Sequence, residues 1–305
     1  MIPVLLCMLS VAFGTLKNTV SKQLSSYSAL PEHISYINLF SMAFAAVGLG
    51  IYAAATGNFA YATGYTLRFA LLYALLSLLS QILLLLAMGC GSVAFSSLVF
   101  SCGFIPSTML GMWYYSEPVR AGQLIGIVIL VFAMYLCLAP KRGEQASCPP
   151  KWFAFAFGAF LCSGLVGFLQ KYHQNGADKA ALPAMLTFVF CINVVCSAGL
   201  FFILHIHLQK KRMQSTPPKA SYSVPHHKRF YLLCILLGGI FAVQNLNNTY
   251  LSGILPSAIF FPILNGSIIL CTALCARFLF GERMRRRQWI GFLIGIAAMI
   301  AVGIF

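Results

Sequence analysis

The chain has 305 residues and carries too few charges for a soluble protein, because 60% of its residues are hydrophobic and only 8% are charged, against about 25% charged in soluble domains. Its formal net charge of +15 is compatible with nucleic-acid binding, but Lys and Arg stand between apolar runs and form no separate basic domain. Loop charges that orient a membrane protein explain them better. The composition therefore predicts an all-α integral membrane protein that does not bind nucleic acid, in a lipid bilayer.

Ten segments along the chain are apolar enough to cross a membrane, which takes about 20 residues of helix. The first starts at the N-terminus and is interpreted as a spanning helix, because it lacks the basic start and the A-x-A site of a signal peptide. We expect four prolines, Pro106, Pro183, Pro256 and Pro262, to start or kink helices, and the polar segment 209–228 to be a solvated loop. The predicted spans are 2–22, 35–56, 68–88, 92–115, 119–139, 152–172, 182–206, 229–250, 254–279 and 287–305.

One stretch of the fifth span occurs again in the tenth. The residues from Glu117 to Met134 match those from Glu282 to Met299 at a constant offset of 165, without a gap. The match includes polar residues that are rare in this chain, which has only five Asp and Glu in total. The matching pairs are Glu117 and Glu282, Arg120 and Arg285, Gln123 and Gln288, and Gly126 and Gly291. We therefore predict a duplication, with residues 1–140 as the first five-helix repeat, 141–151 as a linker, and 152–305 as the second repeat.

An odd number of spans in each repeat has a consequence for orientation. The second repeat must enter the membrane upside down relative to the first, which is the inverted-repeat plan of many secondary transporters. Fifteen Lys and Arg lie in the loops on one side of the predicted membrane and four on the other. By the positive-inside rule the first side is cytoplasmic, and both termini are outside.

The two repeated blocks also carry a family resemblance. Ser116 to Gly126 and Gly281 to Gly291 both read (S/G)-E-x-x-R-x-x-Q-x-I-G, and with the two five-helix repeats they resemble the EamA-type, ten-helix branch of the drug/metabolite transporter superfamily. The resemblance implies transport of small molecules, commonly export of amino acids, metabolites or drugs, from a cavity between the halves. Both termini are usually cytoplasmic in this family, so the charge count and the resemblance disagree on orientation.

We interpret the residues that the two repeated blocks share as having structural roles. Glu117 and Glu282 each lie where a turn enters the next helix, where an acid complements the positive helix end and can pair with an Arg three residues later. The alternative is a gating or coupling carboxylate. The two Gly-x-x-x-Gly patterns that include Gly126 and Gly291 predict close helix packing, either within one chain or in a homodimer.

The candidate cargo site consists of polar residues within the predicted spans. Lys17 is the charge deepest in a span, and with Asn18 it could receive a carboxylate or phosphate; the alternative is that its side chain extends to the membrane surface. Amides in hydrocarbon must find partners, which are either a substrate or another helix. The candidate amides are Gln244, Asn245, Asn247 and Asn248 in the eighth span and Gln81 at a similar depth in the third.

These residues favour a secondary transporter over other classes of protein. The predicted spans contain no Asp or Glu, which argues against proton-coupled export of cationic drugs and for a neutral, zwitterionic or anionic solute such as an amino acid. The leading prediction is efflux across the plasma membrane by alternating access. An exchanger of phosphorylated or nucleotide-linked sugars and a non-transporting scaffold are the alternatives. No catalytic set, metal site or cofactor site is predicted, and the eleven cysteines are interpreted as buried free thiols.

Overall fold

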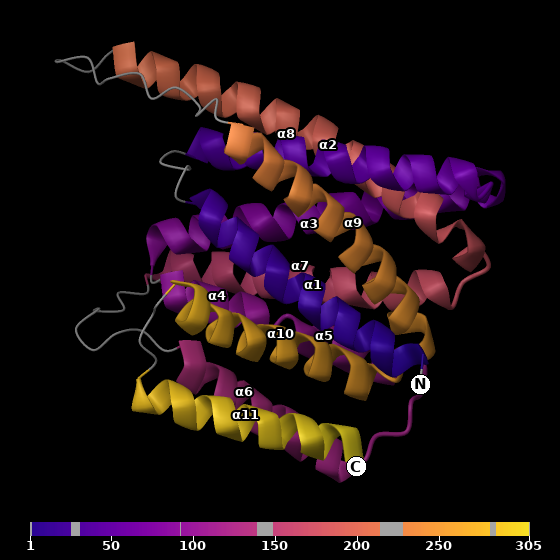
Figure 1. Cartoon of the computed structure of the whole chain (residues 1–305), viewed down its shortest axis with the longest axis vertical. Helices are drawn as coiled ribbons and strands as arrows, with labels where there is room; N and C mark the ends of the chain where they lie inside the picture. Colours follow the sequence, from indigo (N-terminus) through magenta and orange to yellow (C-terminus); the bar gives the residue numbers. More distant parts are fainter. Residues whose placement is uncertain are drawn as a thin grey trace. The chain divides into compact units, whose positions relative to one another are not determined.

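The computed structural model describes residues 2–25, 31–91, 93–138, 149–213, 228–280 and 285–304. Within these ranges the chain is helical, with no strand (Figure 1). The helices are α1 (Ile2–Ser25), α2 (Pro31–Ala55), α3 (Gly64–Cys90), α4 (Val93–Ser101), α5 (Phe104–Tyr114), α6 (Ala121–Leu138), α7 (Pro150–Gln174), α8 (Leu182–Met213), α9 (Lys228–Ile254), α10 (Ser257–Phe280) and α11 (Arg286–Ile304), with short 3-10 helices η1 (Asn58–Tyr61) and η2 (Lys179–Ala181).

The helices follow the predicted spans closely. Eight of them, in the part of the chain that the structure describes, are long and apolar enough to cross a membrane, and α6 is a shorter apolar helix. The fourth predicted span corresponds to the pair α4 and α5. The all-α, multi-pass membrane fold predicted from composition and hydropathy is therefore confirmed.

The helices group into two compact units. Unit 1 contains Met1–Thr15, Leu75–Lys179 and Asn247–Phe305, and unit 2 contains Leu16–Ala74 and Ala180–Leu246. Each unit takes helices from both predicted repeats. The division at the 141–151 linker, which describes the duplication in the sequence, stays a prediction.

In unit 1 the equivalent helices α6 and α11 pack against each other in opposite directions (Figure 1). A Cβ placed on Gly126 would lie 3.3 Å from the carbonyl oxygen of Ala298, and one placed on Gly291 would lie 2.8 Å from that of Ala133. The offset of 165 converts the first contact into the second, as a twofold axis requires. Each contact joins the beginning of one helix to the end of the other, so the two copies run antiparallel, as inverted repeats do.

In unit 2 the equivalent helices α2 and α8 also pack against each other in opposite directions. Gly50, late in α2, lies against Thr187, early in α8, since a Cβ placed on Gly50 would be 3.5 Å from Thr187 Cγ2. Tyr36, early in α2, contacts Phe201, late in α8, with 5.6 Å between ring centroids. These helices also run antiparallel, so each unit contains a pair of equivalent helices in opposite orientation.

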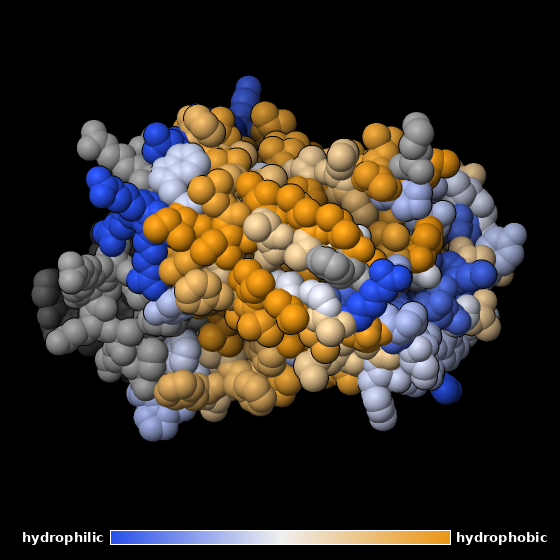
Figure 2. Space-filling model, turned by 90° about the horizontal axis from the view of Figure 1, so that it is seen from below, coloured by the Kyte–Doolittle hydropathy of each residue, from blue (hydrophilic) through white to orange (hydrophobic). Residues whose placement is uncertain are grey.

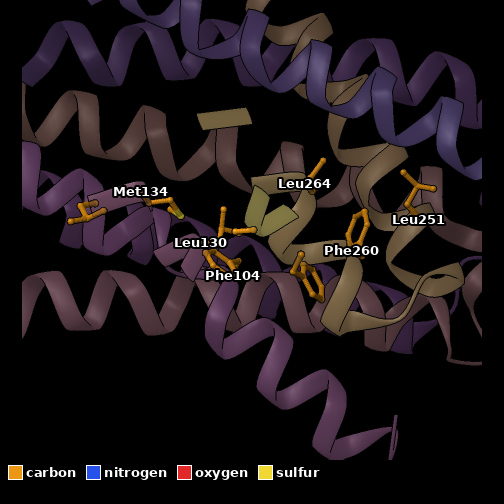
Figure 3. Packing of buried hydrophobic residues seen from close by; sticks show 9 residues of the cluster. Phe104, Leu130, Met134, Leu251, Phe260 and Leu264 are labelled. Carbon is orange, nitrogen blue, oxygen red and sulfur yellow. The ribbon is translucent and has the colours of Figure 1, made fainter. Parts of the chain in front are cut away.

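The core of unit 1 is built mainly by α6, α10 and the ends of neighbouring helices. Hydrophobic side chains from these helices form one buried cluster (Figure 3). The cluster consists of Leu98, Phe104, Leu130, Met134, Leu251, Phe260, Phe261, Leu264 and Ala298. In a membrane protein such packing contributes dispersion energy rather than a solvent-driven effect, because lipid is as apolar as the core.

The fourth predicted span is broken at residues 102 and 103, between α4 and α5. Pro106 explains the position of the break, because proline has no amide hydrogen and its ring displaces the carbonyl four residues earlier, that of Cys102. The Cys102 oxygen instead accepts a bond from Ile105 N at 2.8 Å. The equivalent helix α10 contains Pro262 and continues from Ser257 to Phe280 without a break.

The surface is largely apolar, as expected of helices in lipid. On the face drawn in Figure 2, hydrophobic residues fill the middle and hydrophilic residues gather towards its two sides. Large apolar side chains on the outer faces of α6 and α11 are exposed, including Val128 at 69% and Leu293 at 63%. Lipid chains replace water as the neighbours of these residues.

The close contact of α6 with α11 should be sensitive to a single methyl group. We expect Gly126→Ala to lower stability by about 1–3 kcal/mol, because its Cβ would lie 2.6 Å from Val302 Cγ2. Val302→Ala in the same chain should recover part of the loss. Gly89→Ala is the matched control, since nothing lies within 4 Å of its Cβ position. Thermal unfolding in detergent measures the three variants, and equal midpoints for Gly126→Ala and Gly89→Ala would contradict the tight interface.

Candidate functional site

The predicted cargo residue Lys17 lies beside an aromatic ring in unit 2. Its Nζ is 5.7 Å from the centroid of Phe241, on α9, and the side chain is partly exposed. A cation over a ring face is stabilised by the ring's quadrupole, and this pairing uses one direction of the ammonium. The remaining N–H donors of a lysine are suited to an anionic group such as a carboxylate or phosphate.

Asn245, one helical turn beyond Phe241, connects the same region to α3. Its Nδ2 donates to the carbonyl oxygen of Phe241 at 2.9 Å, and its Oδ1 accepts a bond from the hydroxyl of Tyr73 at 3.2 Å. Tyr73 is buried, with 4% exposure. Within unit 2 the structure thus shows two contacts of α9, one between Phe241 and Lys17 of α1 and one between Asn245 and Tyr73 of α3.

The other predicted site residues divide between the units. Asn18 and Gln244 belong to unit 2; Gln244 is buried and Asn18 is partly exposed. Gln81 and Asn248 belong to unit 1, and both are partly exposed. The Asn248 Oδ1 is buried and has no hydrogen-bond partner among the described residues. Whether these residues contribute to one cargo site stays a prediction.

One of the candidate amides in the eighth predicted span joins helices instead. Asn247 Nδ2 donates to the carbonyl oxygen of Leu6 and to the hydroxyl of Ser10, both at 2.7 Å, and so ties α9 to α1 within unit 1. Asn247 therefore follows the alternative in which an amide joins helices, as Asn245 also does through Tyr73.

The glutamines of the repeated blocks have the same role in both copies. Gln123 Oε1 accepts a bond from the backbone N–H of Arg120 at 3.3 Å, and Gln288 Oε1 accepts one from Arg285 N at 2.9 Å. Each glutamine is the third residue of its helix, and its side chain accepts a bond from the backbone N–H of the residue just before the helix. This bond is one of the two that make up a capping box. The spacing Arg-x-x-Gln is thus a helix-start signal.

The expectations for Glu117 have to be corrected, because it neither begins α6 nor pairs with Arg120. Glu117 pairs with Lys171, near the end of α7, and its Oε2 accepts a bond from the backbone N–H of Ser257 at 2.7 Å. It therefore stabilises the positive end of α10, a different helix from the one it precedes. The sequence offered a nearby cation at i+3, and local rules could not reveal a partner 54 residues away. The equivalent Glu282 lies outside the described residues.

Ser116, the first residue of the repeated block, lies at the end of α5 rather than at the start of α6. Its φ of 50° is in the left-handed region. The amide of Glu117 donates to the carbonyl oxygen of Met112 at 3.1 Å, the bond that closes a Schellman motif at the end of α5. Glycine is the usual residue at this position, and the second copy has Gly281 there.

Another inter-helix contact that sequence reasoning missed lies at the start of α7. The indole Nε1 of Trp152 donates to Ser96 Oγ at 2.9 Å, and Trp152 is 5% exposed. The only signal for this bond in the sequence is the combination of a tryptophan, whose indole N–H needs a partner when it is buried, and a helix that contains several serines. Among the residues that the structure describes, no group of three or more His, Cys, Asp or Glu is placed to hold a metal ion.

The fold and these contacts define a multi-pass helical membrane protein in which equivalent helices pack antiparallel. The model of the EamA-like transporter family matches residues 150–304, and the chain belongs to this family, part of the drug/metabolite transporter superfamily. No curated protein matches the chain. A solved structure, titled "Crystal structure of protein", is similar to it with a TM-score of 0.72 and 9% sequence identity, over 98% of this chain and 96% of the other. At that identity the likeness concerns the fold.

The left-handed residue at the end of α5 gives a stability prediction. We expect Ser116→Gly to raise stability by about 1 kcal/mol, because glycine adopts positive φ without the clash of a Cβ. Ser116→Val should lower stability by more than this, since a β-branched residue is strained there. Thermal unfolding in detergent measures both. A Gly variant that is less stable than the parent would show that the Ser116 side chain matters more than its backbone conformation.

Proposed function

We propose that the chain is a secondary transporter that moves a small neutral, zwitterionic or anionic solute by alternating access. Membership of the EamA-like transporter family supports transport as such. The antiparallel pairs α6 with α11 and α2 with α8 support a mechanism based on inverted repeats. Among alternatives, a membrane enzyme and a scaffold receive no such support from the described residues.

The observation that best supports the cargo class is the group around Lys17. A lysine positioned by Phe241 can bind a carboxylate of the solute. One cation suits a zwitterion such as an amino acid, whose carboxylate would contact Lys17. An exchanger of phosphorylated or nucleotide-linked sugars is the second candidate, and it would need further cations to neutralise a phosphate.

The same proposal includes efflux as the direction of transport, the plasma membrane as the location, and an orientation with both termini outside the cell. Efflux follows from the family resemblance, and the external termini follow from fifteen Lys and Arg in one set of loops against four in the other. Association into homodimers is a separate proposal. Gly126 and Gly291 already pack between α6 and α11 in one chain, so two chains would use other surfaces.

The cargo can be identified by a screen that assumes no particular solute. Untargeted metabolite profiling of cells with and without the protein, inside and outside, should reveal solutes that the protein displaces. Counterflow in proteoliposomes then tests each candidate directly. Cargo-dependent exchange supports transport, whereas no exchange across a broad panel would favour a scaffold.

Lys17 gives the sharpest mutational test of the cargo site. We expect Lys17→Met to raise the KM for an anionic or zwitterionic cargo about tenfold or more, because a hydrogen bond to a charged group contributes about 1.5–3 kcal/mol. Lys17→Arg should retain most of the affinity. Lys228→Met is the matched control, an exposed lysine in the same unit. If Lys17→Met and Lys228→Met transport equally well in counterflow, Lys17 does not bind cargo.

Orientation has its own test. The test uses two kinds of reporter fused after Phe305, an enzyme that is active only outside the cell and a protein that is fluorescent only in the cytoplasm. We expect enzyme activity and no fluorescence, because the positive-inside rule places the termini outside. Fluorescence in the cytoplasm would instead support the orientation usual in the family.

A further inference from the structure

A buried ion pair at one end of unit 1 has no part in the proposed cargo site. Lys171 lies in the last turn of α7, and Glu117 lies in the turn between α5 and α6. The two side chains form a salt bridge and are 5% and 14% exposed. Both belong to unit 1, so the pair is formed within one compact body.

The pair holds three segments of unit 1 together. Lys171 Nζ also donates to the carbonyl oxygen of Leu255 at 3.2 Å, in the turn between α9 and α10, and lies 5.5 Å from the ring centroid of Tyr115. The second carboxylate oxygen of Glu117 accepts the N–H of Ser257, the first residue of α10. The end of α7, the α5–α6 turn and the α9–α10 turn therefore meet at two charged groups.

Two glycines at this junction lie directly against side chains of neighbouring segments. A side chain on Gly111, in α5, would overlap with Ser257, and one on Gly253, in α9, would overlap with Gln174, in α7. Ser257, whose N–H binds Glu117, is fully buried, and its hydroxyl has no hydrogen-bond partner among the described residues. The junction is therefore sealed by packing as well as by charge.

The physics of buried charges makes this junction suited to two discrete states. A buried pair adds little net stability, because desolvation offsets most of the attraction, but an unpaired buried charge is very unfavourable. The two groups are consequently either paired and buried or separated and hydrated. Intermediate arrangements, in which one charge remains dry and alone, are disfavoured.

We propose that Glu117 and Lys171 form a conformational lock, which seals this end of unit 1 when paired and opens it to water when separated. The reason for opening rests on the proposed transport function, since alternating access requires each end of the path to open in turn. The lock itself is a property of unit 1 and can be tested without any cargo. The competing explanation is a permanent structural tie that never separates in the folded protein.

The experiment uses a buried reporter that contacts the pair. Ser257→Cys keeps the N–H that Glu117 binds and removes no hydrogen bond of the hydroxyl. The full-length protein in nanodiscs is treated with a charged, water-soluble thiol reagent, and mass spectrometry follows labelling of the introduced thiol. Native Cys137, which is 5% exposed in the α6–α11 interface of the same unit, reports general loosening or unfolding.

The lock predicts two results. With the ion pair intact, the introduced thiol should be labelled measurably faster than Cys137, because the junction opens while the interface does not. Adding Lys171→Met or Glu117→Gln should raise the labelling rate of the introduced thiol about tenfold or more and leave Cys137 unchanged, since a buried charge without its partner favours the open state. Arg120→Gln, a charge removed from an exposed position in the same turn, is the control and should have no effect.

Two outcomes would overturn the lock. If the introduced thiol reacts as slowly as Cys137 in the protein with the intact pair, the junction is a permanent tie. If neutralising the pair raises labelling at both cysteines together, or at neither, the pair does not control access to this end. Either result would leave transport by the chain untouched, because the labelling needs no cargo and counterflow tests transport separately.

Discussion

The close antiparallel contact between α6 and α11 is the constraint on which the architecture of unit 1 depends. Helices in lipid gain nothing from hiding apolar surface, so they associate where small residues let their backbones approach. Gly126 and Gly291 provide this approach in a reciprocal way, each lying against the far end of the other helix. The same residues that mark the duplication in the sequence thus determine how the two copies meet. Gln123 and Gln288 cap the starts of the two helices in the same way, so that both helices begin at equivalent residues.

The sequence predicted the helices and their inverted relation well, because hydropathy and a fixed offset of polar residues depend on composition and spacing alone. It could not predict contacts between distant segments. Glu117 was expected to pair with Arg120, since local rules see a cation at i+3, yet it pairs with Lys171. The amides of α9 show the same limit: Asn245 and Asn247 are two residues apart and face different helices, and only the packing decides which one joins α9 to α1. The grouping of helices into two units also depends on packing.

Two lysines within helical spans illustrate how surroundings decide the use of one residue type. Lys171 is buried and bonded to a carboxylate and a carbonyl oxygen, so its donors are used within the protein. Lys17 is partly exposed and lies beside the Phe241 ring, which steers the ammonium without neutralising it. In the sequence, Lys17 lies deep within its predicted span, whereas Lys171 lies at the end of its span and was counted with the loop charges. The structure gives Lys171 an ion pair inside unit 1 and places Lys17 beside an aromatic ring.

The break between α4 and α5 has a consequence for the energetics of any cycle based on the two repeats. Their fourth elements differ, since one is interrupted near Pro106 and the other, α10, continues through Pro262. Exchanging the conformations of two identical repeats would give two states of equal free energy. In a cycle of the proposed kind, unlike repeats would make the two states unequal in free energy, so one of them would be more populated in the absence of solute.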